Sequence, residues 1–73
     1  MKYFVNFIEN SIFYESPICQ DRLESKEFKT FLEARTFSKS CDLFDILRCD
    51  ENEEFVTVET NFQIDEDNLI KEI

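Results

Sequence analysis

The sequence predicts a small α+β fold: a β-β-α-β-β antiparallel sheet with one main helix packed on a face and a short C-terminal helix. Several segments alternate apolar and polar residues, as half-buried strands do, and a central segment carries apolar residues at helical spacing. With 73 residues in all, positions 1–73 are expected to form a single compact domain. Nine Phe and two Tyr supply large rings that can fill the core of so short a chain.

The first predicted element is a hairpin formed by residues 3–8 and 12–15. Residues 3–8 alternate, and both faces of this strand carry aromatic rings, so we expect a central strand or a strand that offers one face for contact. The turn is expected at Asn10-Ser11, because asparagine tolerates the left-handed backbone conformation. Pro17 then ends the second strand, since the residue before a proline is biased toward an extended geometry.

A helix is expected from about Lys26 to Lys39. Two starts fit the sequence: Ser25 can cap an early start, and Thr30 with Glu33 forms the T-x-x-E capping box of a later one. We favour a single helix that bends near Lys29-Thr30, at the second cap. The apolar stripe of the later start, which we expect to pack into the core, is Phe31, Ala34, Phe37 and Cys41.

Two strands and a second helix are predicted for the rest of the chain. Residues 43–49 alternate as a strand with one partly wet face, and residues 50–53 form a turn. Residues 54–64 show the cleanest alternation and are expected to form one strand. Its inward residues are Val56, Val58, Thr60, Phe62 and Ile64. Residues 65–73 are expected to form the C-terminal helix, with Asp65 as its N-cap.

The net charge of −9 is unevenly distributed. Residues 1–40 hold six acidic and six basic residues, whereas residues 41–73 hold eleven acidic and two basic ones. The whole excess of negative charge therefore lies in the C-terminal part of the chain. A field of this sign repels nucleic acid and attracts basic protein surfaces. The same charge would also serve solubility alone.

The composition argues against several classes of function. Glycine is absent, which excludes glycine-rich phosphate-binding loops, and histidine, the commonest general base and metal ligand, is absent too. Cys19, Cys41 and Cys49 do not have the spacing of a zinc site and are expected to be reduced thiols in a cytoplasmic protein. We therefore expect no enzyme activity, no cofactor and no metal. The alternative is calcium binding at residues 65–67, which offer oxygen ligands but lack the glycine and glutamate that complete a calcium loop.

Small acidic chains without catalytic groups are typical of stoichiometric binding proteins. We expect a protein that docks on and blocks a basic, nucleic-acid-handling protein site. A phage or mobile-element inhibitor of a host defence complex, such as an anti-CRISPR or a DNA mimic in the host cytoplasm, would have this character. No direct nucleic-acid binding is expected, and the absence of any long apolar run predicts no membrane binding. The predicted partner contacts are Asp50, Glu51, Glu53, Glu54, Glu59, Asp65, Glu66 and Asp67.

An alternative function is a structural or adaptor module that acts through apolar contact. Small sheets leave edges open, so an apolar sheet edge or a homodimer interface could carry the interaction. In that case we expect the strand over residues 3–8 and the strand over residues 54–64 to pair across the dimer axis. Salt distinguishes the two functions, because acidic docking weakens with ionic strength and apolar docking does not.

Overall fold

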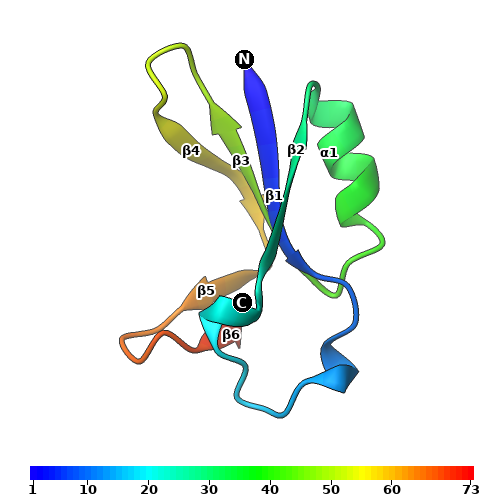
Figure 1. Cartoon of the computed structure of the whole chain (residues 1–73), viewed down its shortest axis with the longest axis vertical. Coiled ribbons are helices and arrows are strands. Elements are labelled where there is room, and N and C mark those ends of the chain that lie inside the picture. The colour runs from blue at the N-terminus through cyan, green and yellow to red at the C-terminus, as the bar shows by residue number, and fades with distance from the viewer.

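Figure 1 shows the computed structural model of the protein, which describes all residues 1–73. The main sheet is antiparallel with four strands in the order β2-β1-β3-β4, and β5 and β6 form a separate antiparallel sheet. The elements are β1 (Lys2–Ile8), η1 (Ser11–Phe13), η2 (Gln20–Arg22), β2 (Glu24–Phe28), α1 (Phe31–Ser38), β3 (Leu43–Cys49), β4 (Phe55–Thr60), β5 (Phe62–Ile64) and β6 (Ile70–Glu72). The predicted α+β class, with a four-stranded antiparallel sheet and one main helix, is confirmed. The second sheet is an addition to the prediction.

β1 lies at the centre of the main sheet, between β2 and β3. Val5 of β1 and Ile46 of β3 are fully buried beneath α1, where Ala34 completes the cluster. The rings of Phe7 and Phe37 pack edge to face, with centroids 4.7 Å apart. The interpretation of residues 3–8 as a central strand is therefore right. Because both edges of β1 are occupied, its expected pairing across a dimer axis is wrong.

α1 begins at the later of the two predicted starts. Thr30 is the N-cap: its hydroxyl oxygen accepts a hydrogen bond from the Glu33 backbone N–H at 3.2 Å, and its hydroxyl lies 3.0 Å from the Glu33 carboxylate. The Thr30 hydroxyl thus accepts from the Glu33 N–H, as in the predicted capping box, and it donates to the Glu33 carboxylate in place of the Thr30 N–H. The favoured single helix from Lys26 to Lys39 is wrong, since Lys26 belongs to β2 and the chain turns from strand to helix at Thr30.

β2 is the strand that pairs with the outer edge of β1. Lys26 of β2 lies opposite Val5, and its ammonium nitrogen is 5.6 Å from the ring centroid of Phe28 and 5.0 Å from that of Phe37. The aliphatic part of Lys26 therefore covers aromatic surface while its charge stays in water. Tertiary contacts thus make a strand of a segment whose local pattern favours a helix.

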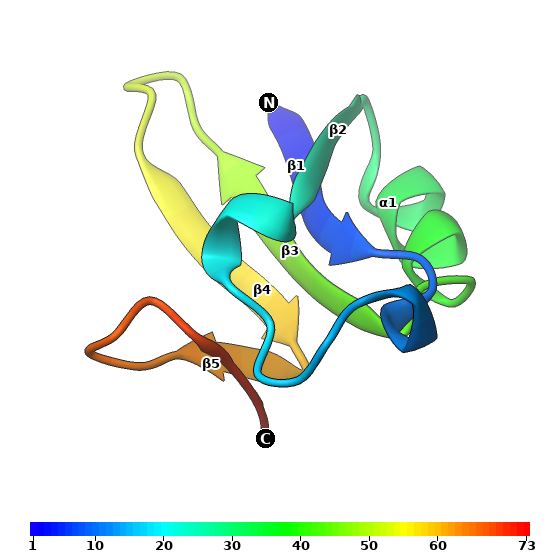
Figure 2. The ribbon, with the colours of Figure 1, turned by 60° about the horizontal axis from the view of Figure 1, so that its bottom comes forward.

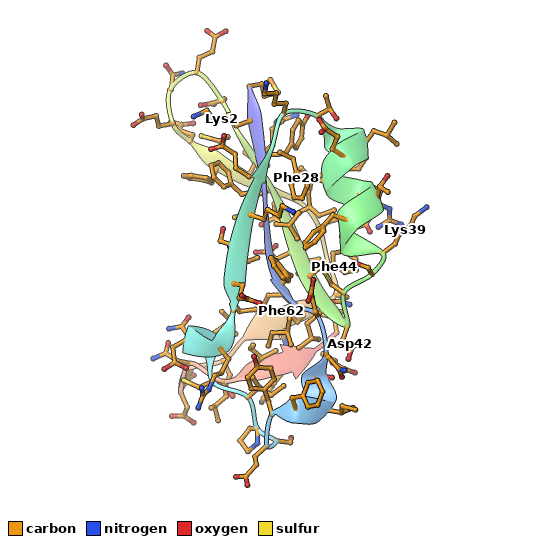
Figure 3. All side chains as sticks on the ribbon, turned by 45° about the vertical axis from the view of Figure 1, so that its right-hand side comes forward. Lys2, Phe28, Lys39, Asp42, Phe44 and Phe62 are labelled. Atoms are coloured by element: carbon orange, nitrogen blue, oxygen red, sulfur yellow. The ribbon has the colours of Figure 1, made fainter.

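The predicted strand over residues 12–15 is wrong. This part of the chain contains the short 3-10 turn η1, in which Ile12 and Phe13 are 81% and 80% exposed. The Asp42 carboxylate accepts hydrogen bonds from the backbone N–H and the hydroxyl of Ser11, both at 2.9 Å (Figure 3). These bonds hold the pKa of Asp42 below its usual range. They tie η1 to the residue that precedes β3, so the chain leaves the sheet instead of returning along β1.

The single strand predicted over residues 54–64 is divided in two. A β-bulge shifts the β3–β4 register next to Ile46 and leaves Val58 without a partner. Asn61 then ends β4: its side-chain oxygen accepts a hydrogen bond from the Phe44 N–H, and its side-chain nitrogen donates to the Asp42 carbonyl, both at 2.9 Å. β5 consequently leaves the main sheet. The expectation that the alternating residues share one face along the whole segment is therefore wrong.

The predicted C-terminal helix is also wrong, because residues 65–73 form a hairpin turn followed by β6. Phe62 of β5 packs against Ile8 and Leu43 in a second buried cluster, at the junction of the two sheets (Figure 3). Ile70 of β6 lies at the margin of this cluster. The small sheet therefore covers one end of the main-sheet face that α1 leaves uncovered.

Candidate functional site

The other end of this uncovered face carries two aromatic rings, one half-buried and one exposed. Phe4 and Phe55 come from β1 and β4, and their ring centroids lie 5.6 Å apart. Leu47 of β3 lines the same shallow hollow, and Phe55 remains 57% exposed. We call Phe4, Leu47 and Phe55 the open face. It lies toward the end of the molecule that holds the N-terminus and the β3–β4 turn, away from β5 and β6 (Figure 1).

A hollow of about 490 Å³ connects the open face with the acidic β3–β4 turn. Its apolar lining comes from Met1, Phe4, Cys49 and Phe55. Its carboxylates are those of Asp50, Glu51 and Glu53, and its one basic side chain is Lys2. Lys2 lies 3.8 Å from Glu27, so its charge already has a partner outside the turn. The hollow is therefore lined by aromatic and other apolar side chains on one side and by acidic residues on the other.

Asp50 shapes the β3–β4 turn. Its Oδ1 atom accepts hydrogen bonds from the backbone N–H groups of Asn52 at 2.8 Å and Glu54 at 3.0 Å. Glu53 occupies the left-handed region with φ of 62°. The Asp50 carboxylate is thus engaged within the turn, whereas Glu51, Glu53 and Glu54 are exposed and their carboxylates accept no hydrogen bond from the protein. Of the predicted contacts here, these three are free to meet a partner.

Asp65 shapes the β5–β6 turn in the same way. Its Oδ1 atom accepts hydrogen bonds from the N–H groups of Asp67 at 2.9 Å and Leu69 at 3.0 Å, and Asn68 is left-handed with φ of 63°. The Leu69 bond is the main reason why the pKa of Asp65 lies below its ordinary value, and Lys71 adds to the effect. Asp65 is therefore a turn residue, and the exposed carboxylates are those of Glu66 and Asp67.

Glu59 differs from the other predicted contacts. It forms an ion pair with Arg35 of α1 and pairs in register with Ile46, so its side chain is on the α1 side of the main sheet. Both side chains of this pair are partly buried. The structure thus separates Glu59 from the acidic turn, with which the sequence grouped it.

The acidic turns have little compensating charge of their own. The protein contains three ion pairs, Lys2–Glu27, Arg35–Glu59 and Lys71–Asp65. None of them involves Glu51, Glu53 or Glu54. Figures 1 and 2 both place the β3–β4 turn and the β5–β6 turn on the same side of the molecule, the first at the start of β4 and the second at the far end of β5. The unpaired negative charge is therefore concentrated along this side.

Sequence reasoning missed the aromatic half of the site. The available signal was the alternation in β1, which places Phe4 on the face opposite Tyr3 and Val5, together with the outward position of Phe55. Recognising the pair requires the strand order, because Phe4 and Phe55 lie on strands that are separated by β3. The acidic half is visible in the sequence because its residues are consecutive.

A polar group lies beside the open face. Asp45 of β3 stands between Asn6 of β1 and Thr60 of β4 in the strand register. Burial raises the pKa of Asp45, and side-chain hydrogen bonds with Asn6 and Thr60 partly oppose the rise. This carboxyl is therefore held by the sheet and not displayed to a partner.

The remaining chemistry-bearing groups do not gather. Cys19 is exposed, Cys41 is half-buried and Cys49 is buried, and all three are free thiols. No group of three or more His, Cys, Asp or Glu side chains is placed to hold a metal ion. No helix is long and apolar enough to cross a membrane. Comparison of the chain with protein-family models, curated proteins and solved structures finds no match.

Proposed function

We propose that this protein is a small acidic, non-enzymatic binding protein that docks on and blocks a basic site of a nucleic-acid-handling protein. The observation that carries the proposal is the β3–β4 turn. It presents Glu51, Glu53 and Glu54 without a basic partner, beside the exposed ring of Phe55. The docking face in this proposal is the turn together with the open face.

The two halves of this face suit two parts of binding. Exposed carboxylates steer a basic partner toward the turn and hold its orientation, an effect that falls as salt increases. Aromatic side chains supply the apolar contact that carries much of the binding energy at protein interfaces. A partner with lysine or arginine around an apolar pocket would complement both halves. Phage or mobile-element inhibitors of host defence complexes, DNA mimics included, act on basic surfaces of this kind in the host cytoplasm.

Charge reversal at the turn tests the proposal. The test variant changes Glu51, Glu53 and Glu54 to lysine. A matched control changes Glu9, Glu15 and Asp21, which are also exposed, and alters the net charge by the same amount. Each tagged protein is used to capture partners from a lysate of its native host at low salt. We expect a basic nucleic-acid-binding protein with the wild type and the control, and its loss with the turn variant. Equal capture by both variants would refute docking through the turn.

A structural or adaptor module is the second candidate, and the exposed side chains of β4 favour it. Val56 and Val58 are 49% and 42% exposed although they lie in a strand. An apolar partner or a second copy on this edge would remain bound in high salt, because apolar contact is not screened. Elution of the captured partner at moderate salt supports the first candidate, and retention at high salt or self-association supports the second.

A further inference from the structure

The two edges of the main sheet differ in how they are protected. The β2 edge carries the charged residues Glu24, Lys26 and Glu27, which oppose pairing with another strand. The β4 edge carries Phe55, Val56 and Val58 in exposed positions, and α1 packs on the other three strands. β4 is the last strand of the main sheet, and no strand of the protein pairs with its outer edge. β4 is therefore the more apolar and less charged of the two edges, with the bulge at Val58 as its one interruption.

The backbone of β4 offers hydrogen-bonding groups on this edge. Asp50 donates its backbone N–H to the Glu54 carbonyl at 3.1 Å, which makes these two residues a hydrogen-bonded pair. In an antiparallel ladder such pairs alternate, so the next one is Arg48 with Val56. The N–H and C=O groups of Phe55 and Thr57 then point away from β3. An added strand can pair with these groups.

The charges at the ends of β4 indicate what kind of strand fits. The β3–β4 turn lies at the start of β4 with Glu51, Glu53 and Glu54, and the β5–β6 turn, with Glu66 and Asp67, lies on the same side of the molecule beyond the other end of β4, where β5 leads away from it (Figures 1 and 2). A second copy paired antiparallel on β4 would bring one copy's first turn beside the other's second turn. Such contact sets carboxylates against carboxylates, which is unfavourable. A strand with basic ends is complementary.

We propose that β4 binds an extended segment of the basic partner by β-strand addition. The segment pairs with the backbone of Phe55 and Thr57, carries β-branched or apolar residues at its centre, and has lysine or arginine at both ends. β4 has six residues and spans roughly 20 Å, so about six residues of the segment lie along it. Main-chain hydrogen bonds supply affinity in this mode, and the flanking charges supply selectivity. This proposal rests on the proposed function and names the docking mode.

The probe for this proposal is a capped peptide with three Thr-Val repeats flanked on each side by two lysines. Amide NMR of the labelled protein follows the titration, and hydrogen exchange reports protection. Thr57→Pro removes an outward N–H without breaking a bond to β3, as proline is tolerated at edge positions. Ser25→Pro is the matched control on β2, where the same alternation places the N–H of Ser25 outward. Thermal unfolding verifies that both variants fold. The same peptide N-methylated at alternate residues cannot donate its hydrogen bonds to β4, so it tests strand pairing on the wild-type protein.

We expect the largest shifts and new protection at Phe55 and Thr57. Thr57→Pro and the N-methylated peptide should each weaken binding about tenfold, as expected when one or two hydrogen bonds are lost, and Ser25→Pro should bind as the wild type does. Shifts confined to residues 50–54, with equal binding by Thr57→Pro, would refute strand addition while leaving acidic docking intact. Absence of binding at low salt, or self-association through β4 in place of peptide binding, would also overturn the proposal. Loss of partner capture by the charge-reversed turn is a separate result, so the two proposals fail independently.

Discussion

Replacement of Glu53 by glycine is expected to stabilise the protein. Glu53 has φ of 62°, in the left-handed region that glycine adopts most readily. It closes the β3–β4 turn, where its N–H donates to the Asp50 carbonyl at 3.1 Å. The turn therefore requires this backbone conformation whichever side chain occupies the position.

The expected gain follows from two opposing contributions. A residue other than glycine in the left-handed conformation is destabilised by about 1–2 kcal/mol. Glycine loses more backbone freedom on folding, which costs about 0.5–1 kcal/mol. The net stabilisation by Glu53→Gly is thus about 0.7 kcal/mol at the centre of a range of about 0–1.5 kcal/mol, and the central value is equivalent to a rise of about 3–6 °C in Tm for a domain of this size.

Thermal and urea unfolding measure this gain, and three variants isolate its cause. Glu53→Gln removes the charge and keeps the backbone preference, so it reports relief of repulsion within the acidic turn. Asn68 occupies the same place in the β5–β6 turn with φ of 63°. Because asparagine already tolerates this conformation, Asn68→Gly should change stability much less than Glu53→Gly does, and Asn68→Glu should destabilise. If Glu53→Gly unfolds at the same temperature as Glu53→Gln or below it, the reasoning is refuted.

Three further perturbations test other parts of the structure. Asn61→Ala should lower the free energy of unfolding in urea by about 1–3 kcal/mol, because it leaves the Phe44 N–H and the Asp42 carbonyl unpaired. A change below the error of the method would show that water replaces the side chain. Glu59→Gln should cost at most about 1 kcal/mol at low salt and less at high salt, because the ion pair with Arg35 is partly exposed; a salt-independent loss would contradict this. Burial raises the folded-state pKa of Asp45 above its ordinary 3.8. The protonated form of Asp45 therefore stabilises the folded protein, fully below pH 3.8, and this stabilisation is lost as pH rises through the folded-state pKa. Asp45→Asn should therefore raise stability at neutral pH and remove that fall, and an unchanged pH profile would exclude Asp45 as its source.

The sequence predicted β3, the turn after it and the capping box of α1 because local chemistry decides all three. Residues 43–49 show the pattern of a strand with one partly wet face, although adjacent apolar residues break the alternation, and the Thr30 hydroxyl caps the Glu33 N–H wherever the helix packs. β2 could not be predicted in this way. Its residues offer a helical cap at Ser25 and helical apolar spacing, and only the free edge of β1 makes them a strand.

The C-terminal error has a different cause. Asp65 accepts backbone N–H groups in its turn just as an N-cap residue does at the start of a helix, so its identity does not discriminate between the two. Asn68 at the left-handed position was the available signal. The pattern Asp-Glu-x-x occurs at residues 50–53 and again at residues 65–68, and both copies form the same turn.

The acidic half of the candidate site was predictable because charge is a property of composition and position. The sequence did not show which of these acidic residues are engaged within the protein: Asp50 and Asp65 shape their turns, and Glu59 pairs with Arg35. These roles depend on hydrogen bonds and register that appear only in the folded chain. The open face likewise depends on the order of the strands.

Docking of a basic partner on the β3–β4 turn is tested most directly by the salt dependence of its Kd. The partner captured by the wild type is titrated against the wild type and the lysine variant of Glu51, Glu53 and Glu54, from low to high ionic strength. We expect the wild-type Kd to weaken steeply with salt, and the variant to bind weakly with little dependence on salt. Equal slopes for the two proteins would contradict docking through the turn and favour apolar contact.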